Sequence, residues 1–251
     1  MRFHNKVALV TGATSGIGRV TAIAFAREGA RVVVAGRRAV EGESLVAELK
    51  SHQTDALFVP TDVSREEQVN GLIEATMKTF GRLDVAFNNA GVEGLRYKPT
   101  HEQTVENYRQ VMDCNVLGVL LCMKYQVPAM LKGGGGVIVN NASVTGVVGV
   151  AGMSVYAASK HAVIGLTRSA ALEYSSQGVR INSVSPGVVE SEMFERMSEE
   201  GSSREMLNKM HPIGRIGKPE EIASAVLYMC SPEAGFLTGA NLPVDGGLTA
   251  Q

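Results

Sequence analysis

Short, continuously apolar segments alternate with longer helical patterns along almost the whole chain. Val7-Ala8-Leu9-Val10 and Val32-Val33-Val34 are apolar at every position instead of at every second one. Such runs are typical of strands that are covered on both faces of a parallel sheet. Parallel neighbours need crossover connections, which are usually right-handed and helical. The alternation therefore predicts an α/β fold, a Rossmann-type doubly wound sheet with helices on both faces.

About seven strands are expected, mainly parallel, at residues 7–11, 31–35, 56–60, 83–88, 136–142, 179–184 and 241–244. Helical patterns lie between them, near residues 17–28, 39–51, 65–80, 104–131, 154–175 and 219–229. No linker rich in Pro, Gly or Ser and no internal repeat divides the 251 residues. Residues 1–251 are therefore expected to form a single domain.

Charge and cysteine content restrict the partners of the protein. Its 24 basic and 25 acidic residues leave a net charge of −1, which gives no sign of a nucleic-acid or membrane-surface partner. The three cysteines show no C-x-x-C spacing, so neither a metal site nor a disulfide framework is expected. The first residues lack an apolar signal segment, and the uncharged stretch 133–159 is too rich in Gly and Asn to span a membrane. We expect a cytoplasmic protein.

One segment interrupts the alternation. Residues 188–210 carry apolar side chains among charges, between the last two expected strands. Ligands of open α/β sheets bind at this edge, and flexible Met side chains suit a closing apolar surface. The segment is interpreted as a substrate lid, with core packing as the alternative. Five residues indicate a mostly apolar pocket: Val144, Val150, Met153, Met193 and Phe194.

A glycine-rich loop, Thr11-Gly12-Ala13-Thr14-Ser15-Gly16-Ile17-Gly18, joins the first strand to the first helix. Glycine lets the backbone turn tightly and approach a pyrophosphate, and the helix N-terminus offers free N–H groups to the anion. The spacing is G-x-x-x-G-x-G, different from the G-x-G-x-x-G fingerprint. The loop predicts a dinucleotide site, although a strand-to-helix turn that binds nothing would show the same glycines.

Two arginines follow the second strand, where an NAD site normally has Asp or Glu on the adenosine ribose. The sequence there reads Gly36-Arg37-Arg38, with no carboxylate to repel a 2′-phosphate and two guanidinium groups to pair with one. NADP(H) is therefore the favoured cofactor. NAD(H) remains possible, because a solvated basic turn would have the same sequence.

The third strand is followed by Asp62-Val63, a candidate contact for the adenine. Asp62 has an alternative role as a cap of the helix that begins near Arg65. Both roles stay open from the sequence.

Tyr156 and Lys160 lie four residues apart, on one face of an expected helix. An alcohol that loses hydride must also lose a proton, and a phenol with an ordinary pKa of about 10 is a poor base at neutral pH. A neighbouring ammonium favours the phenolate, so Lys160 is expected to lower the pKa of Tyr156. Ser143, at the end of the fifth strand, would hold the substrate oxygen. Asn115, polar in an apolar stretch, would link Lys160 to solvent through water, unless its side chain is satisfied by backbone.

Together these residues resemble the short-chain dehydrogenase/reductase family in its compact form, from one end of the chain to the other. The matching motifs are Thr11-Gly12-x-x-x-Gly16-x-Gly18, Asn88-Asn89-Ala90-Gly91, the tetrad Asn115, Ser143, Tyr156 and Lys160, and Pro186-Gly187 with Val189. Ser191 stands where the family often has threonine, which keeps the hydroxyl group.

The resemblance implies that Tyr156 is the acid/base, Lys160 tunes it and holds the nicotinamide ribose, Ser143 positions the carbonyl, and Asn115 supports a proton relay. It also implies a homotetramer. With the sequence arguments above, the residues expected at the cofactor are Gly12, Ser15, Gly16, Ile17, Gly18, Arg37, Arg38, Asp62, Val63, Asn89, Ala90, Gly91, Tyr156, Lys160, Pro186, Gly187, Val189 and Ser191.

The leading hypothesis is an enzyme that transfers hydride between NADP(H) and a small secondary alcohol or ketone. One alternative is a non-catalytic dinucleotide-binding scaffold or redox sensor, which would more often have lost Tyr156 or Lys160. Another is a methyltransferase on a similar sheet, which would leave those two residues without a role. The fold alone does not choose a substrate.

Overall fold

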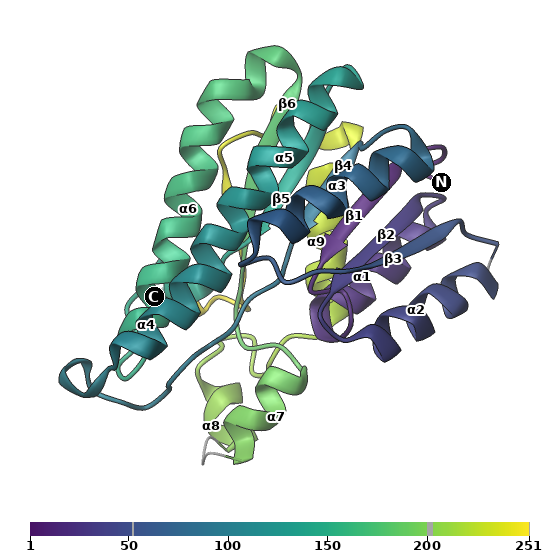
Figure 1. Ribbon diagram of the computed structural model, residues 1–251. Coiled ribbons are helices and arrows are strands. Elements are labelled where there is room, and N and C mark those ends of the chain that lie inside the picture. Colours follow the sequence, from purple (N-terminus) through teal and green to yellow (C-terminus); the bar gives the residue numbers. More distant parts are fainter. Residues whose placement is uncertain (52, 200–202, 251) are drawn as a thin grey trace.

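The structure is a computed structural model that describes residues 1–51, 53–199 and 203–250. Seven strands form one sheet in the order β3-β2-β1-β4-β5-β6-β7, and every neighbouring pair is parallel (Figure 1). The predicted doubly wound α/β fold is confirmed. The strands are β1 (Val7–Thr11), β2 (Arg31–Gly36), β3 (Ala56–Pro60), β4 (Val85–Asn88), β5 (Gly136–Asn141), β6 (Val179–Pro186) and β7 (Asn241–Val244).

Helices cover both faces of this sheet. They are α1 (Gly16–Arg27), α2 (Ala39–Ser51), α3 (Glu66–Phe80), α4 (Val105–Met112), α5 (Gly118–Lys132), α6 (Ser154–Tyr174), α7 (Glu192–Glu199), α8 (Arg204–Lys209) and α9 (Pro219–Cys230). The first strand shows why both faces are apolar. Ala8 and Val10 pack with α1, α2 and α9, whereas Val7 and Leu9 pack with α3, α5 and α6. Consecutive side chains of a strand point to opposite faces, so each of the two cores takes every second residue.

Strand ends differ from the prediction by a few residues. The sixth strand was expected to stop at residue 184 but continues to Pro186, because Ser185 and Pro186 pair with Pro243 and Val244 of β7. The fourth strand begins at Val85 instead of residue 83. The longer β6 carries the chain directly to Gly187, one of the expected cofactor residues.

The long middle helix predicted at 104–131 is interrupted. A π-helical segment, Asp113–Leu117, separates α4 from α5 and carries Asn115. Such single π turns insert one extra residue and occur often at functional sites. Helical periodicity continues across the interruption, so the sequence pattern could not show it.

Taken as one stretch, Val105–Lys132 is also the only helical region among the described residues that is long and apolar enough to cross a membrane. Of its most apolar window, 56% is buried within the protein. Its side chains Val119, Met123, Val127 and Met130 belong to the core between the sheet and α3 and α6. A helix that packs in the core of a parallel sheet meets the same criteria of length and hydropathy, so these criteria do not distinguish it from a membrane-spanning helix.

Strand β7 lies at one edge of the sheet and has a proline in its middle. Ser183 N–H donates to the Ala240 carbonyl and Gly187 N–H to the Val244 carbonyl, so the even-numbered residues here face β6. An N–H group at the odd-numbered position 243 would point away from β6, so the proline there removes no hydrogen bond between β6 and β7.

The segment between β6 and β7 forms two short helices, α7 and α8, which project beyond the carboxyl ends of the strands (Figure 1). Val188, Phe194, Leu207 and Ile216 make a small apolar cluster of their own there. Residues 200–202 of the predicted lid lie outside the described part of the chain, as does the side chain of Met193. The described part of the segment is thus packed at the edge where a ligand of this sheet is expected.

Candidate active site

The glycine loop makes a turn that only glycine fits. Gly12 has φ +61°, and a Cβ atom there would lie 2.8 Å from the Cα of Ala90. A Cβ at Gly18 would lie 2.3 Å from the carbonyl oxygen of Gly12. Both positions exclude larger residues on backbone geometry alone.

The N-terminus of α1 suits an anion. Ser15 is the N-cap, but its side chain caps no amide, and the first turn, which contains Ile17, holds no acidic residue. Uncapped N–H groups and the positive end of the helix dipole attract phosphate. Gly16 has φ +52°, and a Cβ atom there would lie 3.5 Å from the Cβ of Ser191. The start of the segment 188–210 thus borders the loop that would hold the pyrophosphate.

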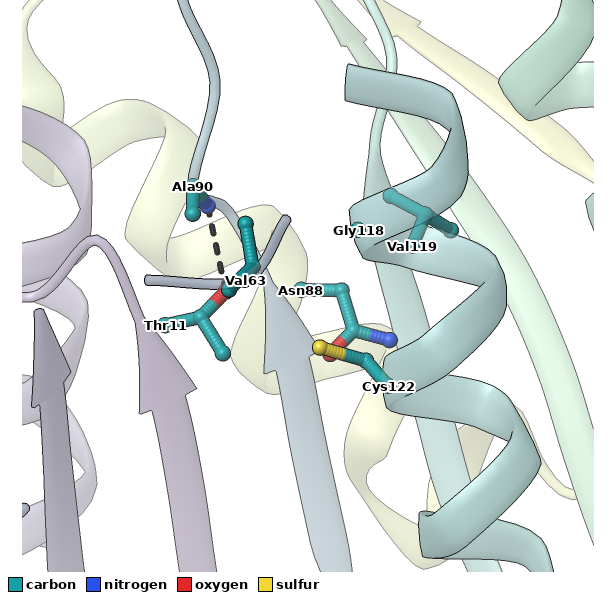
Figure 2. A pocket seen from close by; sticks show the side chains of 7 residues that line it. All are labelled: Thr11, Val63, Asn88, Ala90, Gly118, Val119 and Cys122. Carbon is teal, nitrogen blue, oxygen red and sulfur yellow. Dashed lines mark hydrogen bonds between the residues drawn. The ribbon is translucent and has the colours of Figure 1, made fainter. Parts of the chain in front are cut away.

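Asn89 and Ala90 fix this loop from the side of β4. The N–H groups of both residues donate to Thr11 Oγ1, at 3.0 and 3.1 Å, and the Asn89 amide donates to the carbonyls of Thr11 and Gly12, each at 3.1 Å. Figure 2 shows the residues that pack beneath this loop. Thr11, Val63, Asn88 and Ala90 lie opposite Gly118, Val119 and Cys122 of α5. The space between them has no room for a water molecule, so the floor of the site is dry.

Beneath Asn89 lies a cluster of buried amide and hydroxyl groups that the sequence analysis missed. Asn88 exchanges hydrogen bonds with Gln126 and donates to Asn140 at 2.9 Å. Asn140 donates to Thr167 Oγ1 at 3.0 Å. All four residues are at most 2% exposed, and their partners lie 27 to 52 positions away in the chain. A polar residue at a core position was the one signal available.

Asn115 is held by protein groups on every side. Its Oδ1 accepts from Val92 N–H at 2.8 Å, and its Nδ2 donates to the Val92 carbonyl at 2.9 Å and to Ser159 Oγ at 3.0 Å. Two of these bonds go to backbone atoms and one to a hydroxyl group, and the expected water link from Asn115 to Lys160 stays a prediction. Asn115 joins the segment after β4 to α6 and brings Gly91 beside the site: a Cβ there would lie 3.5 Å from Lys160 Nζ.

Tyr156, Lys160 and Ser143 come together at the carboxyl end of β5. Lys160 Nζ lies 5.5 Å from the centre of the Tyr156 ring and donates to the Asn141 carbonyl at 2.9 Å. Ser143 hydrogen-bonds to the phenol of Tyr156. The three sequence-predicted residues therefore share one site, and Tyr156 and Lys160 are only 9% and 4% exposed.

Burial sets the protonation of this pair. It raises the pKa of Tyr156 to about 12. The hydrogen bond from Ser143 acts to lower this pKa, and the negative charge of Glu93 raises it slightly further. Burial also lowers the pKa of Lys160, to about 8. Burial therefore outweighs the groups that act on Tyr156 in the chain alone, and Lys160 is not one of the groups that shift its pKa. The expected tuning of Tyr156 by Lys160 stays a prediction.

Arg37 and Arg38 point to different partners. Arg37 is exposed, and its charge reaches Asp62 and Cys114. Arg38 donates to Thr14 Oγ1 of the glycine loop at 3.2 Å and to the carboxylate of Glu192 at 3.1 and 3.2 Å. The two guanidinium groups therefore bracket the end of β2.

Asp62 makes a local turn. Its Oδ1 accepts from the N–H of Ser64 at 3.0 Å and from the Ser64 hydroxyl at 2.7 Å. The N-cap of α3 is Arg65, so Asp62 does not cap that helix, as one alternative had it. Burial works against the charge of Asp62, but these hydrogen bonds and the Arg37 charge hold its pKa below the usual value.

The segment after β6 lines the same edge. A Cβ at Gly187 would lie 2.8 Å from His211 Nε2, which instead accepts from the Val188 N–H at 3.1 Å. Pro186 and Val189 are buried. Ser191 Oγ donates to the Val189 carbonyl and accepts from the N–H of Phe194, in the first turn of α7. Gly187 also lines a hollow of about 360 Å³, together with residues that include Ile213, Arg215 and Val244.

A second ion pair ties α7 to the substrate side. Glu93 Oε1 accepts from Arg96 Nη1 at 3.1 Å and from Arg196 Nε at 2.9 Å. The Glu93 and Arg96 side chains are 11% and 3% exposed, and Arg196 belongs to α7. Glu93 follows Asn88-Asn89-Ala90-Gly91 closely and was noticed in the sequence. Arg196, its partner 103 positions away, could not be recognised from the sequence.

Over residues 1–51, 53–199 and 203–250, no three His, Cys, Asp or Glu side chains are grouped so that they could hold a metal ion. Cys114, Cys122 and Cys230 are free thiols. The site is thus built from hydroxyl, amide, ammonium and guanidinium groups, over a glycine loop that fits a pyrophosphate.

These features define a nucleotide-binding α/β protein, and comparison with known proteins gives its family. The family model described as enoyl-(acyl carrier protein) reductase matches residues 12–249. Cyclohexanol dehydrogenase of Acinetobacter sp. (strain SE19) is 42% identical over 250 residues, which are 100% of this chain and 97% of that protein.

Solved structures agree. The crystal structure of levodione reductase has a TM-score of 0.95 and 36% identity and covers 99% of both chains. The protein ElxO with NADP bound has a TM-score of 0.92 and 34% identity, over 98% of this chain and 99% of that one. The chain belongs to the short-chain dehydrogenase/reductase family.

Family membership makes the protein an oxidoreductase that acts on alcohol or carbonyl groups with a nicotinamide cofactor. The comparisons support the enzyme hypothesis and not the non-catalytic scaffold, redox sensor or methyltransferase.

Proposed function

We propose that the enzyme uses NADP(H) to interconvert a cyclic secondary alcohol and its ketone, with Tyr156 as acid/base. The observation that carries the proposal is the grouping of buried Tyr156 and Lys160 with Ser143 at the carboxyl edge of the sheet, where the glycine loop also lies. The bound nicotinamide supplies or accepts the hydride. The protein's own residues handle the proton and the substrate oxygen.

In the direction of reduction, the Ser143 and Tyr156 hydroxyls hold the carbonyl oxygen of the substrate. Tyr156 donates its proton to that oxygen as negative charge develops there. The raised pKa of Tyr156 keeps the phenol protonated at neutral pH, which suits this direction. Lys160, with a pKa of about 8, is mostly an ammonium at pH 7 and stabilises the phenolate that remains.

The loop residues Gly12, Ser15, Gly16, Ile17 and Gly18 would hold the pyrophosphate. Asp62, Val63, Asn89, Ala90 and Gly91 would line the adenosine and the inner ribose. Pro186, Gly187, Val189 and Ser191 would contact the nicotinamide, with Tyr156 and Lys160 on its ribose.

Arg37 and Arg38 support NADP(H) over NAD(H). Both lie at the end of β2, where a ribose 2′ group is expected, and Arg38 also bonds to the glycine loop through Thr14. A solved structure of the similar protein ElxO has NADP bound.

The lid interpretation of residues 188–210 is part of the proposal. Ser191 borders Gly16, Glu192 reaches Arg38, and Arg196 reaches Glu93. The segment therefore touches the proposed cofactor and substrate sides at once. Val144, Met153 and Phe194 are buried and would supply an apolar wall. Such a wall suits an alicyclic ring, and cyclohexanol is the substrate in the name of one relative.

We further propose one domain, a cytoplasmic location and a homotetramer. Exposed apolar side chains support association: Val105, Tyr108, Leu117 and Leu120 lie along α4 and α5, and Phe236 is fully exposed. Single exposed residues of this kind are ordinary, but a row along one helical face favours a partner surface.

The first experiment titrates the protein with NADPH and NADH, followed by nicotinamide fluorescence, for the wild type, Tyr156→Phe and the double variant Arg37→Ala/Arg38→Ala. We expect the wild type to bind NADPH more tightly than NADH and the double variant to lose this preference. Tyr156→Phe should bind both cofactors within about twofold of wild type but turn over cyclohexanone about 10³ times more slowly, as loss of a general acid implies.

Tyr125→Phe is the control, since it removes a phenol that bonds to Glu66 on the surface. Full turnover by Tyr156→Phe would refute the acid/base assignment. Equal affinity for both cofactors in the wild type would refute the NADP(H) preference.

A further inference from the structure

Arg38 is already engaged by an acidic residue of the lid. Its Nη1 donates to both carboxylate oxygens of Glu192, at 3.1 and 3.2 Å, and its Nε donates to Thr14. A second carboxylate, that of Glu41, lies farther away, at 3.9 Å. The main acidic partner of this guanidinium thus comes from 154 positions later in the chain.

Glu192 is well placed to act on the cofactor. It is the first residue of α7 and follows Ser191, whose Cβ borders the glycine loop at Gly16. The side chains of Arg38 and Glu192 are 40% and 48% exposed, so the pair can open without disturbing the core. Elsewhere on α7, Arg196 holds Glu93.

We propose that Glu192 is a specificity-determining residue that competes with the 2′-phosphate of NADP(H) for Arg38 and so limits the preference for NADP(H). The proposal rests on the cofactor site proposed above.

The charges explain the competition. A phosphate monoester carries about −1.5 to −2 charges at pH 7 and pairs with guanidinium groups more strongly than one carboxylate does. When the 2′-phosphate takes Arg38, the Glu192 carboxylate either leaves or stays beside a like charge, and both are unfavourable. NADH has a hydroxyl at that position and leaves the Arg38–Glu192 pair intact. Glu192 therefore weakens the binding of NADPH and not of NADH.

The expected size follows from exposure. A half-exposed ion pair contributes little free energy, so its loss should change the dissociation constant of NADPH only about two- to fivefold. Release of Glu192 also frees the first turn of α7, so occupation of the 2′-phosphate position is transmitted to the segment that reaches Glu93.

The test compares the dissociation constants of NADPH and NADH for the wild type, Glu192→Gln, Arg38→Ala and the double variant. Adenosine 2′,5′-bisphosphate and AMP, as competitors of bound NADPH, report the 2′-phosphate alone without any turnover. Glu195→Gln is the matched control, since Glu195 is an exposed carboxylate of the same helix and no ion pair with Arg38 is observed for it among the described residues. Glu192→Ala repeats the test should the glutamine variant fold poorly.

We expect Glu192→Gln to tighten NADPH and adenosine 2′,5′-bisphosphate two- to fivefold, with NADH and AMP unchanged. The gain should vanish in the Arg38→Ala background. Unchanged or weaker NADPH binding by Glu192→Gln, or an equal gain from Glu195→Gln, would overturn the inference and leave the NADP(H) preference standing. If Arg38→Ala alone leaves the NADPH to NADH ratio unchanged, Arg38 does not bind the phosphate. That result contradicts the proposed role of Arg38 as well as the inference.

Discussion

Two regions meet at the carboxyl edge of the sheet, and they are held together in opposite ways. The region around β4, β5 and α6 fixes its polar groups by buried hydrogen bonds: Asn88, Asn140 and Lys160 are 2%, 0% and 4% exposed. The segment α7–α8 is held by ion pairs with at least one solvated partner, such as Arg38 with Glu192 and Arg196 with Glu93.

The difference separates two tasks. Proton transfer needs atoms held within about 0.5 Å of their working positions, and buried side chains joined by hydrogen bonds favour such precision. Admission of cofactor and substrate needs a segment that opens at little cost, and exposed ion pairs contribute little to stability. On the proposed function, the first region would carry the proton transfer and the second would cover the cofactor and the substrate.

The strongest test of this contrast is Asn88→Ala. It leaves the amide of Gln126 and the Oδ1 of Asn140 without their buried partner. An unsatisfied buried polar group costs about 1–3 kcal/mol, so the free energy of unfolding should fall by about 2–4 kcal/mol. Urea denaturation at fixed protein concentration measures it.

Asn70→Ala provides the comparison, because Asn70 donates only to Glu74 on the exposed side of α3. We expect a change below about 0.5 kcal/mol for that variant. If Asn88→Ala lowered the free energy of unfolding by an equally small amount, the buried hydrogen bonds would not distinguish the two regions.

Lys160→Met should separate activity from stability. In the folded protein burial holds the pKa of Lys160 at about 8, below its ordinary value of 10.5, so the unfolded chain binds more protons between these pH values. Wild-type stability therefore rises as pH increases from about 8 to 10.5, and below pH 8 the buried charge is a net cost.

Removal of that charge should raise the free energy of unfolding at pH 7 by about 2 kcal/mol, after loss of the hydrogen bond to Asn141. The gain should shrink towards pH 10.5, while turnover is lost. Unfolding curves at pH 7 and pH 10 measure it, with the exposed Lys132→Met as reference. Destabilisation at pH 7 would mean that the ammonium is better solvated than its burial indicates.

Arg196→Ala should have the smallest effect on stability, below about 1 kcal/mol, because its side chain is half exposed and Arg96 still pairs with Glu93. We expect a two- to fivefold higher KM for the ketone with kcat nearly unchanged, since the variant loosens α7 and spares the catalytic group. Lys209→Ala is the control, because its ion pair with Glu205 stays within α8. An unchanged KM would show that this ion pair does not serve substrate binding.

The sequence predicted what depends on local pattern. Short runs rich in apolar and β-branched residues located all seven strands, and residues 7–11, 56–60 and 241–244 match β1, β3 and β7 at both ends. Tyr156, Lys160 and Ser143 were expected together, and the structure brings them together. Their roles stay predictions until they are tested.

What the sequence did not reveal depends on distant contacts. The π turn at Asp113–Leu117 keeps the apolar periodicity of its helix. Gln126, Glu192 and Arg196, the distant partners of Asn88, Arg38 and Glu93, lie 38 to 154 positions away from them. The pKa of Tyr156 could not be inferred from its spacing to Lys160, because spacing carries no information on how much solvent the fold removes.

The proline of β7 has a consequence for how copies of this chain can meet. A sheet edge with a full row of free N–H and C=O groups invites a further strand, which is a route to aggregation. Pro243 removes the outward donor from the middle of a four-residue strand, so an incoming backbone would find an incomplete ladder there. Addition of a further strand across this edge is therefore disfavoured.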